Sequence, residues 1–163
     1  MDPFTIRRAL PDDAAACAET VAASIRMLCE ADHHRDPAIL SRWLADKTPE
    51  HLVSRIAGPG RVFVAECRGA VVGVGEVEAD PHPPGTGKIT LNYVAPAFRG
   101  QGISRALLAA MEADLRGLGR PEASLTATAT ARDFYLAHGW QVAAPPRQGR
   151  WIVGHPMRKD LNA

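Results

Sequence analysis

Apolar residues recur with helical spacing through the first third of the chain. A short apolar and basic segment, residues 6–10, comes first, and apolar residues then recur three or four positions apart. This spacing predicts one amphipathic helix over residues 12–31. Asp36-Pro37 and Thr48-Pro49 each combine a capping side chain with a proline suited to the first helical position, so two further helices should begin there.

After Gly58-Pro59-Gly60 the pattern changes to that of strands. Residues 61–67 and 70–79 predict two strands joined by a tight turn at Arg68-Gly69. The prolines within residues 80–85 predict a loop, because proline cannot sustain a strand ladder. Strands are predicted at 88–94 and 123–126, around Gln141 and at 151–158, and helices from Ile103 to Gly117 or Gly119 and at 129–138. Helices interleaved with strands in this order predict an α/β fold with helices packed on a central sheet.

Composition narrows the class of protein. With 163 residues and 17.5 kDa the chain has the size of one domain, which we assign to residues 1–163, and residues 1–4 look like an expression-vector remnant. Lys and Arg number 19 against 18 Asp and Glu, so the basic excess of a general nucleic-acid binder is missing. No apolar run approaches the roughly 18 residues that a membrane span needs. Three widely spaced cysteines without a C-x-x-C pair argue against a disulfide framework and a metal site, and fit a cytoplasmic protein.

Residues 94–108 carry the clearest chemical signal. A strand ends at Val94, a turn contains Gly100 and Gly102, and a helix begins immediately afterwards. Glycines allow close approach of a ligand to the backbone, and the free N–H groups of a helix start suit a pyrophosphate. Taken alone, the pattern predicts a phosphate-bearing ligand, and a plain strand-to-helix turn explains the glycines equally well. A P-loop is missing, and Arg105 occupies the third glycine position of a dinucleotide-binding motif.

Two segments resemble the GNAT superfamily of N-acetyltransferases. Arg99-x-x-Gly102-x-Ser104 is similar to its acetyl-CoA signature Q/R-x-x-G-x-G/A, with a compact serine in the last place. Residues 131–140 are similar to the A-x-x-[FL]-Y-x-x-x-G-[FW] segment of the family, and the order of elements agrees over roughly residues 5–160. The resemblance implies a mixed, mostly antiparallel sheet of about seven strands, splayed in the middle, with helices on both faces. It also implies an acetyl-CoA-dependent N-acetyltransferase.

The same resemblance implies how the cofactor is held. Backbone N–H groups of the glycine-containing turn would bind its pyrophosphate, and an N–H at or near Val94 would polarise the thioester carbonyl. The strand around Tyr93 would separate from its neighbour and leave backbone groups for the pantetheine arm. Thr128 stands where many relatives carry a cofactor-contacting asparagine. The implied cofactor-binding residues are Tyr93, Val94, Arg99, Gly100, Gln101, Gly102, Ile103, Ser104, Thr128 and Phe134.

Tyr135 is the predicted general acid. A tyrosine with a pKa of about 10 stays protonated at neutral pH and can supply a proton to the departing thiolate. Phe134 beside it is explained at least as well as a core aromatic. For the base, strand alternation places Glu76 and Glu78 on one face together with Val72 and Val74, and we take Glu76 first, Glu78 second, and water as a further alternative. A solvent-exposed strand end explains both glutamates as well, and Asn92 is placed to orient a water.

The acceptor remains open at this stage. The resemblance implies direct attack of a primary amine on bound acetyl-CoA in a ternary complex, with a small-molecule or peptide acceptor and neither nucleic acid nor membrane as partner. Met27, Glu30, His33 and Trp43 are candidates for the acceptor-side wall; a solvated turn is the alternative for His33, and the core for Trp43. A homodimer stays open. The rival hypothesis is a non-catalytic acyl-CoA-binding or sensing module of the same fold.

Overall fold

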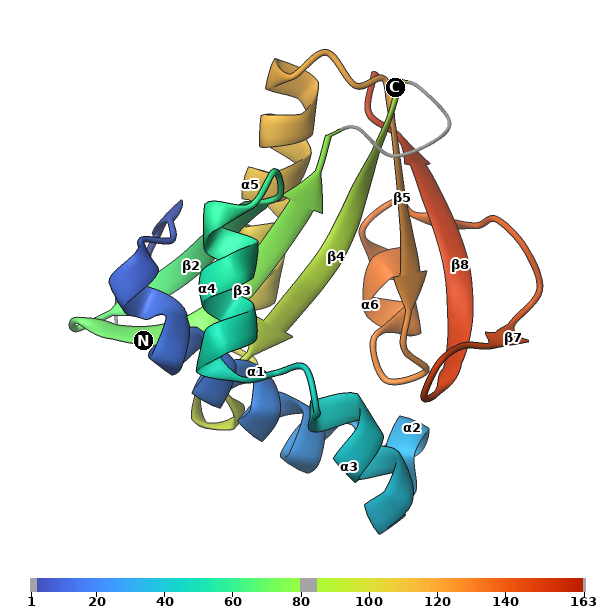
Figure 1. Cartoon of the computed structure of the whole chain (residues 1–163). Helices are drawn as coiled ribbons and strands as arrows, with labels where there is room; N and C mark the ends of the chain where they lie inside the picture. Colours follow the sequence, from blue (N-terminus) through green and yellow to red (C-terminus); the bar gives the residue numbers. More distant parts are fainter. Residues whose placement is uncertain (1–2, 80–84, 163) are drawn as a thin grey trace.

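The computed structural model describes residues 3–79 and 85–162, which form one eight-stranded sheet with helices on both faces (Figure 1). The sheet order is β1-β2-β3-β4-β5-β8-β6, with β7 paired to β8. All strand pairs are antiparallel except β4 with β5. The strands are β1 (Thr5–Arg8), β2 (Arg61–Cys67), β3 (Ala70–Glu78), β4 (Thr86–Val94), β5 (Glu122–Ala127), β6 (Gln141–Val142), β7 (Arg147–Gln148) and β8 (Val153–Asp160). The helices are α1 (Ala14–Leu28), α2 (Glu30–His33), α3 (Pro37–Leu44), α4 (Pro49–Ala57), α5 (Ile103–Gly117) and α6 (Arg132–Ala137), and short 3-10 turns lie at Pro11–Asp13 and Pro96–Phe98.

The mixed, mostly antiparallel sheet predicted from the sequence is confirmed. The strand beyond the predicted seven is the two-residue β7, which is too short to leave a periodic pattern. The helix predicted over residues 12–31 is divided: a 3-10 turn precedes α1, and α2 follows a break at Cys29. The loop predicted at 80–85 lies outside the described residues except for Gly85.

Local capping sets the starts of α3 and α4, as predicted. The Asp36 side chain accepts a hydrogen bond from the Ala38 N–H over 2.9 Å. Thr48 Oγ accepts one from the His51 N–H over 3.3 Å. Each cap satisfies an N–H that has no partner within its own helix, and each is followed by proline.

Two apolar layers hold the helices on the sheet. Core residues of α1 and α4, such as Ile25 and Leu52, pack on one face, and core residues of α5, such as Met111, pack on the other. Helix α5 lies close to the sheet because glycines stand beneath it: a Cβ added at Gly87 would lie 2.4 Å from Leu115 Cδ2. Phe4, set aside in the sequence as part of a vector remnant, packs against the α5-side core.

The sheet opens between its two central strands. β4 pairs with β5 only where residues 86–88 face residues 122–124, and beyond this point the strands diverge (Figure 1). On the opposite side of β4, Glu76 pairs with Leu91 and Val77 with Ile89, so Thr90 is the extra residue of a bulge. The predicted splay is therefore present, and it leaves one side of residues 89–94 without a neighbouring strand.

Candidate functional site

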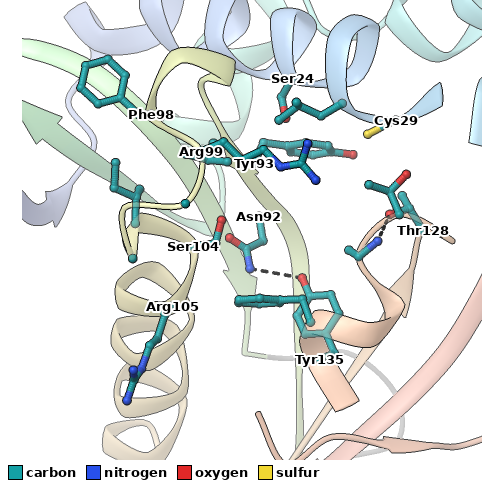
Figure 2. Close-up of a pocket in the computed structure, with 18 residues that line it drawn as sticks. Ser24, Cys29, Asn92, Tyr93, Phe98, Arg99, Ser104, Arg105, Thr128 and Tyr135 are labelled. Atoms are coloured by element: carbon teal, nitrogen blue, oxygen red, sulfur yellow. Dashed lines mark hydrogen bonds between the residues drawn. The ribbon is translucent and has the colours of Figure 1, made fainter. Parts of the chain in front are cut away.

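A cavity of about 340 Å³ lies where β4 and β5 separate, between α1, the start of α5 and α6 (Figure 2). All the predicted cofactor-binding residues except Gln101 line this cavity, and Tyr135 lines it as well. Segments far apart in the chain thus meet at the point where the sheet has lost a strand pairing. This cavity is the candidate site.

The turn between β4 and α5 presents free backbone amides at one end of the cavity. Gly100 and Gly102 have φ of 80° and 83°, in the left-handed region that favours glycine, and Gly102 caps α5. The first intrahelical bond of α5 runs from the Ala106 N–H to the Gly102 carbonyl over 3.0 Å, so the preceding helical N–H groups have no partner within the helix. The Arg99 N–H is used differently from the prediction: it donates to the Pro96 carbonyl over 3.3 Å. The run of free amides therefore starts at Gly100 and suits an anion.

The Val94 amide points into the gap between β4 and β5. Val94 pairs with Gly73, and the Ala95 N–H donates to the Val72 carbonyl over 2.8 Å. In an antiparallel ladder this bond marks Val94 and Gly73 as a non-hydrogen-bonded pair, whose own N–H and C=O groups face away from each other. The Val94 N–H is therefore free on the side from which β5 has separated.

Tyr135 lies on the α6 side of the cavity. It is 5% exposed, and its hydroxyl oxygen accepts a hydrogen bond from Asn92 Nδ2 over 3.2 Å (Figure 2). Burial raises the pKa of Tyr135 to about 12, and the hydrogen bond from Asn92 opposes this rise. The hydroxyl is therefore protonated at neutral pH. Because Asn92 is the donor in this contact, the Tyr135 proton remains available to a third group.

Thr128 and Phe134 complete the wall on this side. Thr128 Oγ accepts a hydrogen bond from the Ala131 N–H over 3.0 Å, which caps the turn before α6 and leaves the hydroxyl proton free. The Phe134 ring lies edge-on to Tyr135 at 5.2 Å between centroids and beside the His138 ring at 4.3 Å. Phe134 thus both packs against the core and faces the cavity.

Comparison with known proteins decides the family. The sequence model described as an acetyltransferase (GNAT) domain matches residues 30–161. The chain belongs to the GNAT acetyltransferase family. A search of curated protein sequences finds no match.

Solved structures agree with this enzyme over nearly their whole length. A GCN5-related N-acetyltransferase from Rhodopseudomonas palustris is 25% identical, with coverage of 98% of this chain and 97% of that chain and a TM-score of 0.82. The PaiA N-acetyltransferase from Thermoplasma acidophilum, in complex with coenzyme A, has the same TM-score of 0.82 at 17% identity, covering 97% and 99%. YncA from Salmonella typhimurium, with its cofactor acetyl-CoA, is 24% identical, covers 99% and 95%, and has a TM-score of 0.68.

The structure does not place Glu76 and Glu78, the two residues predicted as candidates for the general base, beside Tyr135. Glu76 is 2% exposed, forms an ion pair with Arg55 of α4 and accepts a hydrogen bond from Thr90 Oγ over 2.5 Å. Together with Glu78 it lines a separate cavity of about 450 Å³ beneath α4. Glu76 is therefore a buried partner of Arg55 outside the candidate site, and this geometry does not support its assignment as the catalytic base.

The predicted shared face on β3 holds for three of its four residues. Val72 belongs to the α5-side core and Val74 to the α1-side core, although they stand two residues apart. The register between β2 and β3 shifts between Ala65 and Glu66, so Val72 is an extra residue on β3. The prediction that these residues share one face is therefore wrong for Val72, whereas Val74, Glu76 and Glu78 do share the face toward α1 and α4.

The predicted acceptor-side residues divide into core and surface. His33 is 1% exposed; its Nδ1 accepts the Arg35 N–H over 2.9 Å, and its Nε2 faces the Ile25 and Arg26 carbonyls at 3.0 and 3.2 Å. His33 thus caps the end of α1, and the alternative of a solvated turn is wrong for this residue. Trp43 is buried in the core, whereas Met27 and Glu30 are exposed.

Sequence analysis missed the wall that α1 contributes. Ser24 and Leu28 line the cavity one helical turn apart, and Cys29 follows them. Their spacing was the available signal, but it is also that of an ordinary core face. Burial raises the pKa of Cys29 to about 12, so it is a thiol and not a nucleophile at neutral pH.

Within 3–79 and 85–162, no group of three or more His, Cys, Asp or Glu side chains is placed to hold a metal ion. Over those residues, every helix is too short or too polar to cross a bilayer.

Proposed function

We propose that this enzyme, acting as one domain, transfers an acetyl group from acetyl-CoA to the primary amine of a small molecule or peptide by direct attack in a ternary complex. The observation that carries the proposal is the continuity of one cavity from the free amides at the start of α5 to the Tyr135 hydroxyl. Both reactants held in one cleft lose most of the entropic cost of a bimolecular encounter.

The residues present fit acetyl-CoA. Amides from Gly100 to Ser104, with the positive end of the α5 dipole, suit its pyrophosphate, and a Cβ at either Gly100 or Gly102 would meet no other atom within 4 Å. The exposed guanidinium of Arg99 adds positive charge there. The gap between β4 and β5 has the place and the free backbone groups for the pantetheine arm.

The Val94 amide and the Tyr135 hydroxyl divide the catalytic work. Acetyl-CoA supplies an activated thioester, whose carbonyl carbon the acceptor nitrogen attacks. The free N–H of Val94 stabilises the negative charge that develops on the carbonyl oxygen. As the carbon–sulfur bond breaks, Tyr135 donates its proton toward the sulfur, and its raised pKa keeps that proton in place at neutral pH.

Water removes the proton of the acceptor ammonium in this proposal. Among the described residues no carboxylate lines the cavity. Asn92 Oδ1 is buried and has no hydrogen-bond partner. This oxygen is placed to accept a hydrogen bond from the acceptor nitrogen or from the water that takes its proton.

Release of the coenzyme A thiol from acetyl-CoA, measured with a panel of primary amines, tests the proposal. We expect thiol release that depends on the amine and falls in Tyr135→Phe. Saturable acetyl-CoA binding without transfer to any amine of the panel would favour the non-catalytic binding module. Equal turnover of the two proteins would remove Tyr135 from the mechanism.

A further inference from the structure

Asp32 on α2 is a buried carboxylate that reaches across the fold. It is 7% exposed and accepts hydrogen bonds from the Ala129 N–H over 2.7 Å, the Thr130 N–H over 3.2 Å and Thr130 Oγ over 2.6 Å. These donors lie 97 or 98 residues away in the chain, in the turn between β5 and α6. Over the described residues, no ion pair joins Asp32 to a cationic side chain, so oriented neutral donors hold its charge.

The contact joins two adjoining walls of the cavity. Thr130 and Ala131 of the β5–α6 turn line one wall, and Cys29 at the end of α1 lines the other. The Asp32 N–H donates to the Cys29 carbonyl over 2.9 Å. The backbone of Asp32 is thus tied to the wall that contains Cys29, and its carboxylate to the wall formed by the β5–α6 turn.

The turn held by Asp32 also leads directly to the proposed acid. The Tyr135 N–H donates to the Ala131 carbonyl over 3.2 Å, in the first turn of α6. A shift of the β5–α6 turn would therefore move Tyr135 relative to β4 and to the Val94 amide. Displacements of this kind slow transfer steeply, because the reacting atoms must be held within tenths of an ångström.

We propose that Asp32 is a positioning residue for acetyl transfer: it fixes the β5–α6 turn against α1 and so sets the place of the Tyr135 hydroxyl. The inference rests on the proposed function. Asp32 itself touches neither reactant in this assignment. It acts through Thr130 and Ala131, and its loss lowers turnover more than cofactor binding, because the amides at the start of α5 do not depend on it.

Thr130→Val and Thr130→Ser form the central test. Valine keeps the shape but removes the hydroxyl that donates to Asp32, whereas serine keeps that donor. A hydrogen bond to a charged group corresponds to roughly a tenfold change or more, so we expect kcat of Thr130→Val to fall about tenfold. Thr130→Ser should stay close to the wild type, and Asp32→Asn should fall further than Thr130→Val. The KM for acetyl-CoA should change little in all three.

Two further measurements separate positioning from simple destabilisation and from failure of the proposed function. To exclude destabilisation, all assays are run well below the melting temperature of each variant. To test coupling to Tyr135, Thr130→Val is repeated in the Tyr135→Phe background, where its effect on kcat should largely disappear. Equal losses in Thr130→Val and Thr130→Ser, or an undiminished effect without the Tyr135 hydroxyl, would overturn the inference. If Tyr135→Phe alone turned over at the wild-type rate, Tyr135 would not be the general acid, and the proposed action of Asp32 through Tyr135 would fail with it. A drop in Tyr135→Phe with unchanged Asp32 and Thr130 variants would leave the proposed function standing and refute only the role of Asp32.

Discussion

Asn92 on β4 donates a hydrogen bond to the hydroxyl oxygen of Tyr135 on α6, across the gap that the separated strands leave (Figure 2). The direction of this bond matters, because a phenol that accepts from one side offers its own proton elsewhere. The donor amide thereby orients the Tyr135 proton, and the first two predictions concern this pair.

Tyr135→Phe removes the proposed proton donor and keeps the ring that packs beside Trp140. We expect kcat to fall by about a hundredfold, the lower end of what a positioned acid contributes. Acetyl-CoA affinity, measured by calorimetry, should stay near that of the wild type, because the amides after Arg99 are untouched. A large loss of affinity with little change in kcat would assign Tyr135 to binding instead.

Asn92→Asp reverses the hydrogen bond with almost no change in size. A carboxylate is an acceptor only, so it draws the Tyr135 proton toward itself and away from the sulfur. We expect kcat at neutral pH to fall by about tenfold. The control is the same substitution in Tyr135→Phe, where no further loss should occur; an additive loss would show that Asn92 acts independently of Tyr135.

The raised pKa of Tyr135 also predicts how stability depends on pH. The pKa is about 12 in the folded protein and about 10 in an unfolded chain, so the folded state keeps a proton that the unfolded state loses. This contribution to the free energy of unfolding is complete below pH 10 and is lost as the pH rises through 12. Denaturant titrations over that interval should show a shallower decline in Tyr135→Phe; identical slopes for both proteins would contradict the shift.

Gly102→Ala tests the amide turn at the start of α5. Alanine at a φ of 83° costs about 1–2 kcal/mol of folding free energy and favours a different path of the turn. Gly119 is the matched control, with a φ of 76° and open space around it, but at the other end of α5. Both variants should melt lower by similar amounts, whereas only Gly102→Ala should weaken acetyl-CoA binding in a thermal-shift titration. Equal acetyl-CoA binding by both variants would show that this turn does not hold the pyrophosphate.

Glu76→Gln tests whether Glu76 acts as the catalytic base or only as the buried partner of Arg55. Loss of the buried carboxylate leaves Arg55 without its ionic partner, and we expect the free energy of unfolding to fall by about 1–3 kcal/mol. Because Glu76 lies in the cavity beneath α4, kcat of the folded variant should stay within about twofold of the wild type. A collapse of kcat with unchanged stability would restore Glu76 as the base.

Sequence reasoning worked where the signal is local. Local patterns predicted the helix caps at Asp36 and Thr48 and the glycine turn before α5. Each depends on residues within a few positions of one another, so a single sequence is enough to recognise it. Most of the cofactor wall follows from that turn and from the segment around Tyr135. Even so, the pattern alone indicated only a phosphate-bearing ligand, and the family resemblance was needed to specify the rest.

The failures share one physical cause, which is dependence on contacts far along the chain. Period-two alternation correctly placed Val74, Glu76 and Glu78 on one face, but it could not show that this face meets Arg55 of α4 instead of Tyr135; the bulge that displaces Val72 is likewise specified by the partner strand. Asp32 and His33 carry no motif, yet one anchors a distant turn and the other caps α1. Their roles depend on which segments meet in three dimensions.

The separation of β4 from β5 has a consequence for the enzyme before it meets any ligand. The edge of β4 that faces this gap carries backbone donors and acceptors that only water can satisfy until a ligand binds there. Among the described residues, the strand pairing between the two halves of the sheet consists of residues 86–88 with 122–124. Acetyl-CoA would therefore supply hydrogen-bond partners that β4 lacks on this side. Without the cofactor, we expect the sheet to open first between β4 and β5, so that the Val94 amide exchanges its hydrogen faster than the paired amides of β3.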